Sequence, residues 1–240
     1  MIKLAISGCA GKMGTRIFNL ASEDKDLRPV VGIEQAETLG QCLKTDGFKV
    51  SDNPDDIKEA DVLIEFTTPE ATIEHLKYAF KHKKAMVVGT TGLSEGQIGR
   101  IKEASKKIPI VLSPNMSIGV NLLFKLVKEA AEKLSKDYSV KILEAHHIHK
   151  KDAPSGTAKK LAQIIKDASG REVSDIKAIR EGEIVGDHKV TFESPVDSIE
   201  LSHSARTRDI FAKGALVAAK FIVGKQPQLY DMQDVLGAIK

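Results

Sequence analysis

Residues 2–14, IKLAISGCAGKMG, decide the fold of the first half of this chain. Ile2 to Ser7 form a short apolar run, which predicts a buried strand. A glycine-rich turn follows directly, and apolar residues then recur with helical spacing from Met13 to Ala21. A strand, a glycine-rich turn and a helix in this order predict the first unit of a parallel α/β sheet.

The glycine-rich turn also predicts a ligand. Gly8, Gly11 and Gly14 let the backbone turn tightly and let a pyrophosphate approach the positive end of the helix. The spacing is G-x-x-G-x-x-G, because Ala10 stands where the common dinucleotide pattern has its second glycine. Glu34 lies 20 residues after Gly14 and ends the next predicted strand, where a carboxylate accepts hydrogen bonds from ribose hydroxyls. We therefore expect a bound dinucleotide; the alternative is a tight turn without a ligand.

Short apolar runs continue to alternate with helical patterns up to about residue 112. Further strands are predicted at 28–34, 60–66, 85–88 and 109–112, with helices at 69–80 and from about residue 94. This alternation predicts a Rossmann-like, doubly wound parallel sheet with helices around it. Ligands bind outside the carboxyl ends of the strands in such sheets, where the loops 66–69, 89–92 and 113–116 fall.

The pattern changes near Ser117. A long helix is predicted over 117–134, then a strand at 140–145, a helix at 158–168, strands at 176–180, 188–193 and 198–203, and a helix at 211–222. The last three strands follow one another without helices, which predicts an antiparallel or mixed sheet. We therefore predict an α/β chain of two domains: 1–117 with 209–240, and an α+β domain over 118–208.

The composition is that of an ordinary globular protein, with 42% hydrophobic and 29% charged residues among 240. A net charge of +3, no tryptophan and 5% aromatic residues give no support for nucleic-acid or membrane binding. Cys9 and Cys42 are too few for a disulfide framework and suit a reducing cytoplasm. The N-terminus leads into the glycine-rich turn without a long apolar segment, and Lys220 interrupts the apolar stretch 214–223. We expect neither a signal peptide nor a membrane span.

Residues 144–163, EAHHIHKKDAPSGTAKKLAQ, gather three histidines and two lysines just before a turn. Only His147 and His149 would share a face of a regular strand, and no cysteine is near, so we predict no metal site. A solvated basic face is the second interpretation. The turn 154–157 immediately precedes a helix, however, and can present N–H groups and hydroxyls to an anion. With a histidine as proton donor, the segment predicts a site for a carboxylate-bearing substrate.

The stretch from Glu144 to Ala158 closely resembles the signature of the 4-hydroxy-tetrahydrodipicolinate reductase (dihydrodipicolinate reductase) family of diaminopimelate and lysine biosynthesis. The likeness extends to the glycine-rich turn, to GTTG at 89–92, NMSIGVN at 115–121 and YDMQDVL at 230–236. The resemblance implies an NAD(P)H-dependent oxidoreductase that converts 4-hydroxy-tetrahydrodipicolinate to tetrahydrodipicolinate with loss of water. It also implies a homotetramer that assembles through the second domain and acts on a small dicarboxylate; from the cysteine usage we expect it in the cytoplasm.

The same resemblance assigns site residues. His146 would be the proton donor and Lys150 its catalytic partner. The substrate would be held by His147, Ser155, Gly156, Thr157 and Arg208. The dinucleotide would lie along Gly8, Cys9, Ala10, Gly11, Lys12, Met13, Glu34, Gly89, Thr90, Thr91, Ser113, Pro114, Asn115 and Met116.

The residues after the second strand bear on the choice of cofactor. Glu34 repels a 2′-phosphate, and Gln35 is uncharged where some family members have arginine. Lys12 is the only nearby cation of the turn, so we expect NADH to bind at least as well as NADPH. Two other interpretations remain open. A dehydrogenase like aspartate semialdehyde dehydrogenase needs a nucleophilic cysteine, which neither Cys9 nor Cys42 is placed to supply. A non-catalytic dinucleotide-sensing protein would leave His146 and Lys150 without a task.

Overall fold

The computed structural model describes residues 1–43 and 45–239. The chain divides into two compact units: unit 1 is Met1–Ser117 with Phe211–Lys240, and unit 2 is Ile118–Ile210. From the sequence we placed the boundaries after residues 117 and 208. Lys240, the last residue of the predicted first domain, lies outside the described residues.

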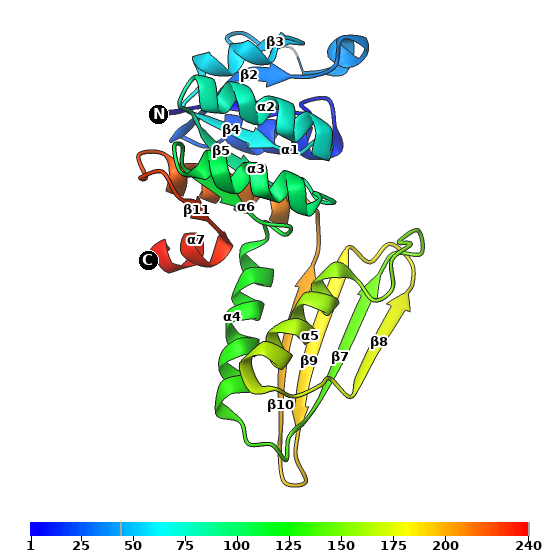
Figure 1. Cartoon of the computed structure of the whole chain (residues 1–240). Coiled ribbons are helices and arrows are strands. Elements are labelled where there is room, and N and C mark those ends of the chain that lie inside the picture. Colours follow the sequence, from blue (N-terminus) through cyan, green and yellow to red (C-terminus); the bar gives the residue numbers. More distant parts are fainter. Residues whose placement is uncertain (44, 240) are drawn as a thin grey trace. The chain divides into compact units, whose positions relative to one another are not determined.

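Unit 1 contains a seven-stranded sheet among its described residues, in the order β11-β6-β5-β4-β1-β2-β3 (Figure 1). All its strand pairs are parallel, which confirms the predicted Rossmann-like sheet. The strands are β1 (Ile2–Ser7), β2 (Leu27–Ile33), β3 (Lys49–Ser51), β4 (Val62–Glu65), β5 (Ala85–Val88), β6 (Ile110–Leu112) and β11 (Leu229–Tyr230). The edge strands β3 and β11 were not predicted from the sequence.

Helices pack on this sheet because its central strands β4 and β5 are apolar except for Glu65 at the end of β4. Every residue of β4 and β5 is buried, as expected for a parallel sheet that is covered on both faces. The helices are α1 (Lys12–Ser22), α2 (Pro69–Lys81), α3 (Glu95–Ser105), α6 (Asp209–Ile222) and α7 (Met232–Ala238), with the 3₁₀ helices η1 (Ala36–Gln41) and η2 (Pro54–Glu59). Thr68 and Ser94 cap α2 and α3, so both helices begin directly after loops at the carboxyl edge of the sheet.

Unit 2 contains a four-stranded sheet in the order β10-β9-β7-β8. Its strands are β7 (Ser139–His146), β8 (Asp175–Arg180), β9 (Gly186–Glu193) and β10 (Ser198–Ala205), and its helices are α4 (Ile118–Lys133) and α5 (Gly156–Ser169). β9 runs antiparallel to β7 and β10, and β8 runs parallel to β7, which confirms the predicted mixed sheet. α4 and α5 lie along this sheet (Figure 1), and Val127, Leu161 and Phe192 join the three elements in one core.

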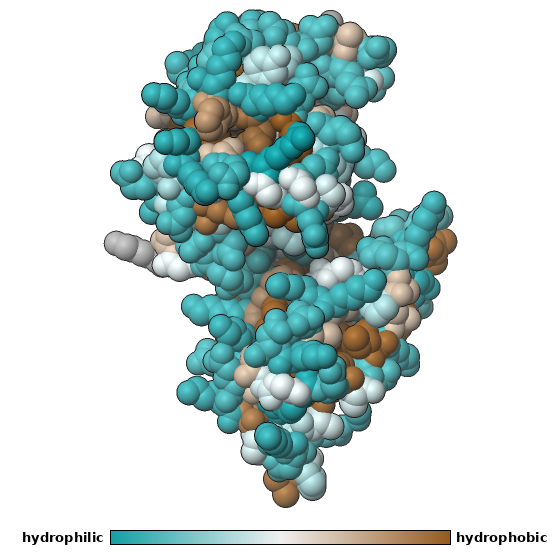
Figure 2. Space-filling view, viewed as in Figure 1, coloured by the Kyte–Doolittle hydropathy of each residue, from teal (hydrophilic) through white to brown (hydrophobic). Residues whose placement is uncertain are grey.

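One face of the second sheet has no cover in the described part of unit 2. His188, Val190 and Phe192 of β9 are buried toward the helices, whereas the alternating Asp187 and Lys189 are partly exposed. The visible surface of both units is mostly hydrophilic, with apolar patches between polar side chains (Figure 2). No described helix is long and apolar enough to cross a bilayer.

Candidate functional site

The glycine-rich turn of unit 1 joins β1 to α1. A Cβ on Gly14 would lie 2.1 Å from the carbonyl oxygen of Gly8, so only glycine lets the helix start so close to the turn. Gly11 is the N-cap of α1 and supplies no side-chain acceptor for the first N–H groups of the helix. The helix start therefore has the backbone donors and the dipole that a pyrophosphate requires.

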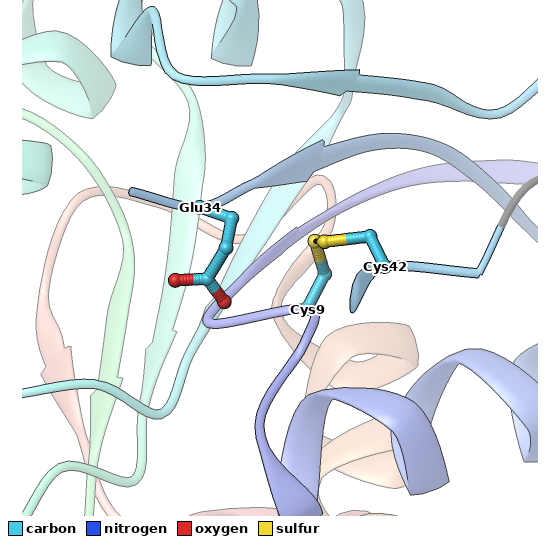
Figure 3. A group of neighbouring side chains, drawn as sticks. All are labelled: Cys9, Glu34 and Cys42. Carbon is cyan, nitrogen blue, oxygen red and sulfur yellow. Dashed lines mark hydrogen bonds between the residues drawn. The ribbon is translucent and has the colours of Figure 1, made fainter. Parts of the chain in front are cut away.

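Glu34 follows β2 and lies against this turn. Its carboxylate accepts hydrogen bonds from the backbone N–H of Ala10 at 3.0 Å and of Gln35 at 3.0 Å. The thiols of Cys9 and Cys42 lie beside it (Figure 3), and the three side chains offer ligand atoms within 4.8 Å of one another. The structure thus brings together the glycine-rich turn and Glu34, the two features for which the sequence predicts dinucleotide binding.

The other two predicted cofactor loops follow β5 and β6. Thr90 Oγ1 accepts a hydrogen bond from the N–H of Thr67 at 3.3 Å, and Ser113 Oγ donates to the carbonyl of Asn115 at 2.9 Å. Because β1, β2, β5 and β6 are parallel, these loops and Glu34 share the carboxyl edge of one sheet. Lys12, Thr91 and Pro114 are exposed there. The side chain of Met116 belongs to the core, with 1% of the residue exposed.

In unit 2, Glu144 is the centre of a buried polar cluster. It lies on the same face of β7 as His146, and none of its surface is exposed. Its carboxylate accepts a hydrogen bond from Nδ1 of His146, two from the Arg180 guanidinium at 3.0 and 2.8 Å, and one from the N–H of Ser155 at 3.0 Å. Four donors thus hold one carboxylate in place.

The charges in this cluster set the state of His146. Burial alone would raise the pKa of Glu144, but Arg180, His146 and the Ser155 N–H lower it below its usual value, so the group is an anion. Burial lowers the pKa of His146; Glu144 opposes that shift, and the charges of Lys150 and Arg180 add to it. Because Nδ1 faces a carboxylate, Nδ1 carries a hydrogen and Nε2 is the nitrogen left for chemistry. A Cβ on Gly186 would lie 3.1 Å from Nε2, so glycine at 186 keeps this side of the ring uncrowded.

Ser155 is the N-cap of α5 and fixes the start of that helix. Its Oγ accepts the N–H of Ala158 at 3.2 Å and lies 3.2 Å from Nε2 of His188, while its own N–H donates to Glu144. Both groups are thus engaged inside the protein, and the assignment of Ser155 as a substrate ligand stays a prediction. Gly156 and Thr157 occupy the first turn of α5, at the positive end of the helix dipole.

The remaining predicted residues follow β7. β7 ends at His146, one residue beyond the predicted strand, and a turn follows in which the N–H of Lys150 donates to the carbonyl of His147. Lys150 forms an ion pair with Asp152 at 2.8 Å. Nδ1 of His147 is buried without a hydrogen-bond partner among the described residues. Arg208 is exposed just before α6, and no described contact joins it to the Glu144 cluster.

Three members of the cluster were missed from the sequence: Arg180, Gly186 and His188. They lie on β8 and β9, more than thirty residues from His146, and no local motif marks them. The role of Glu144 could have been inferred, because it stands two residues before His146 in a predicted strand and therefore shares its face.

His188 should make unit 2 sensitive to acid. Burial, with a contribution from the charge of His146, lowers its pKa from 6.5 to about 4. Below pH 6.5 the unfolded chain therefore binds the proton first, and stability is lost as the pH falls from 6.5 to 4, by about 3 kcal/mol over that window. We expect His188→Gln to lose less stability than the wild type between pH 7 and 4.5 in urea unfolding. Equal losses in both proteins would contradict this role.

Comparisons with known proteins agree along the whole chain. Two family models match it: "Dihydrodipicolinate reductase, N-terminus" at residues 2–116 and "Dihydrodipicolinate reductase, C-terminus" at residues 119–236. The 4-hydroxy-tetrahydrodipicolinate reductase of Syntrophus aciditrophicus is 42% identical over 99% of each chain. That of Aquifex aeolicus is 44% identical over 98% of this chain and 99% of its own. The fold resembles a dipicolinate-bound dihydrodipicolinate reductase from Paenisporosarcina, with a TM-score of 0.85 at 23% identity over 96% of this chain and 97% of that one.

Proposed function

The chain belongs to the dihydrodipicolinate reductase family, and on that premise we propose that it reduces 4-hydroxy-tetrahydrodipicolinate to tetrahydrodipicolinate with loss of water. The reaction serves diaminopimelate and lysine biosynthesis. One observation carries the proposal beyond the family match: a buried Glu144–His146 pair, braced by Arg180, ends beside the N-terminus of α5. A dinucleotide sensor would have no use for such a proton donor.

The nicotinamide dinucleotide of this family supplies the hydride when it is bound. The residues of unit 1 fit such a group. The start of α1, which lacks a side-chain cap, would bind the pyrophosphate, and the Glu34 carboxylate would accept hydrogen bonds from the ribose hydroxyls. The loops after β5 and β6, with Thr90, Ser113 and Asn115, would hold the nicotinamide half.

Unit 2 handles the substrate and the proton. Lys150 and the first turn of α5, with Gly156 and Thr157, hold a carboxylate, and His147 and Arg208 complete the substrate contacts. After loss of the 4-hydroxyl as water and addition of a hydride at C4, the enamine carbon takes the proton of His146 Nε2. Acid catalysis of this kind contributes about 10²–10⁴-fold. Glu144 keeps the ring in the required tautomer and stabilises its cationic form.

The function is tested by mixing the protein and NADH with a freshly made substrate. The substrate forms when an aldolase condenses pyruvate with aspartate semialdehyde. We expect the NADH absorbance to fall at once, and only when both the protein and the freshly made substrate are present. Tight NADH binding without any loss of absorbance would indicate the sensor instead.

NADH should be used at least as well as NADPH. The Glu34 carboxylate accepts ribose hydroxyls and repels a 2′-phosphate, and Gln35 supplies no cation to offset it. Glu34→Gln should lower kcat/KM for NADH about tenfold, since hydrogen bonds to a charged group are worth about 1.5–3 kcal/mol, and should leave NADPH unaffected or improved. Paired kinetics of both proteins with both cofactors measure the ratio. An unchanged NADH to NADPH ratio in the variant would contradict the role of Glu34.

We also propose a cytoplasmic homotetramer that assembles through unit 2. Its sheet has one face that α4 and α5 do not cover within the described chain, and partly exposed residues of β9 lie on it. Light scattering of the purified protein should give four times the chain mass; a monomer mass at working concentration would contradict the assembly.

A further inference from the structure

The two cysteines of the chain meet in the glycine-rich turn. Cys9 and Cys42 are 33 residues apart in sequence, yet their Sγ atoms are 2.8 Å apart (Figure 3). Cys9 is the second residue of the turn, and Cys42 follows η1 in the connection between β2 and β3. Both are free thiols and both are buried, with 3% and 6% of their surface exposed.

We propose that Cys9 and Cys42 form a reversible disulfide whose closure weakens dinucleotide binding. The inference rests on the proposed role of the glycine-rich turn. In the closing step each thiol gives up its hydrogen and one S–S bond forms. A two-electron thiol oxidant takes up the two electrons and two protons; with diamide, the N=N bond becomes HN–NH. A dithiol reductant reverses the step.

The geometry favours a disulfide over a metal. Two thiolates on a tetrahedral zinc ion, at Zn–S distances of about 2.3 Å, stand roughly 3.8 Å apart. A disulfide has an S–S distance of about 2.05 Å. The observed 2.8 Å therefore requires the sulfurs to approach slightly for a disulfide but to separate for a metal. The third candidate ligand, Glu34, accepts a backbone N–H on each oxygen and is the proposed acceptor of the ribose hydroxyls, which would compete with a metal.

The surroundings of the thiols make the reduced pair slow to react but do not stabilise it. Burial, contact with Cys42 and the charge of Glu34 raise the pKa of Cys9 far above its usual range, and burial raises that of Cys42. Little thiolate is present at neutral pH, so oxidation is slow. The reduced pair also gains nothing from ionisation, so the disulfide should persist once formed until a reductant is added.

Closure should disturb the cofactor site because the side chain of Cys9 has little room to move unless its backbone moves too. Its Sγ lies only 2.7 Å from where a Cβ on Gly32 would stand, so the backbone of β2 backs the sulfur. The residue after Cys9 is Ala10, whose N–H holds the Glu34 carboxylate. Drawing the sulfurs together therefore shifts the turn against Glu34, and we expect the Kd for NADH to rise about tenfold.

The test uses the full-length protein treated with diamide at pH 8, where more thiolate is present. Because the chain has two cysteines, thiol titration after denaturation should fall from two to zero. The intact mass should drop by two hydrogen atoms without dimer formation. NADH fluorescence titration should show the weaker binding, and dithiothreitol should restore the original Kd.

Cys42→Ser is the matched control, since it keeps Cys9 and removes the partner. Reduced Cys42→Ser should bind NADH as the wild type does, and diamide should not change its Kd. Two thiols that survive diamide in the wild type would overturn the proposal, as would a closed disulfide with unchanged NADH affinity. Thiols that react only after a chelator is added would overturn it in favour of a metal site. A reduced wild type that does not bind NADH would contradict the proposed function itself.

Discussion

His146→Gln should lower kcat by about 10²–10⁴-fold, the usual contribution of a positioned general acid, and change KM little. Glutamine keeps a polar side chain of similar length but cannot deliver a proton near neutral pH. His149→Gln is the matched control: His149 is exposed, three residues along the same segment, and has no partner in the Glu144 cluster among the described contacts. In steady-state kinetics with NADH, kcat should therefore be low for His146→Gln and close to the wild-type value for His149→Gln.

The pH profile of the wild type should carry the same signature. His146 has a lowered pKa in the free enzyme, chiefly through burial, so kcat/KM should fall with rising pH at a lower pH than an ordinary histidine would set. A bound dicarboxylate brings negative charge to the ring and favours its cationic form. The corresponding fall of kcat should therefore lie at higher pH than that of kcat/KM.

Two outcomes would contradict this role. A large rise in KM with unchanged kcat in His146→Gln would make the residue a substrate ligand. In the second outcome, kcat and kcat/KM of the wild type would fall together at the pKa of an ordinary histidine. The burial of His146 would then not lower its pKa.

The parts of the fold that were predictable are those with a strong local pattern. β1, the glycine-rich turn and α1 follow from the consecutive residues 2–21, and β4 and β5 from short apolar runs. β3 and β11 were missed because two or three residues show no period; the neighbouring strands create them by pairing. α7 has seven residues and begins at Met232. The side chain of its N-cap, Asp231, accepts N–H groups of the first turn, so the only local signal for this short helix is its cap.

The candidate site divides in the same way. His146, Lys150 and the α5 start lie within one segment, so a motif could reveal them. Arg180 and His188 reach the cluster through sheet register, because His146 pairs with Arg180 on β8 and Glu144 pairs with His188 on β9. Register is set by how whole strands dock, and a single sequence carries no local record of it.

Glu144→Gln should both destabilise the protein and shift its catalysis to lower pH. The variant leaves the Arg180 guanidinium, whose side chain is 18% exposed, without its anion, which should cost about 3 kcal/mol of unfolding free energy. It also removes the charge that holds up the pKa of His146, so the ring loses its proton at still lower pH. The amide can donate to Nδ1 and favour the wrong tautomer, so kcat should fall about 10²-fold or more.

Arg180→Gln tests whether the cluster controls the proton of His146 or only stabilises the fold. It also breaks the buried pair, so urea unfolding should show a loss of similar size. It removes a positive charge that lowers the pKa of His146, however, so the fall of kcat/KM with pH should move upward, opposite to Glu144→Gln. If the cluster only supported the fold, both variants would be less stable, but their pH profiles of kcat/KM would not differ. The pH at which kcat/KM falls can move in opposite directions, at equal loss of stability, only if Glu144 and Arg180 act on the proton of His146. A folding defect alone would not move this pH in opposite directions in the two variants.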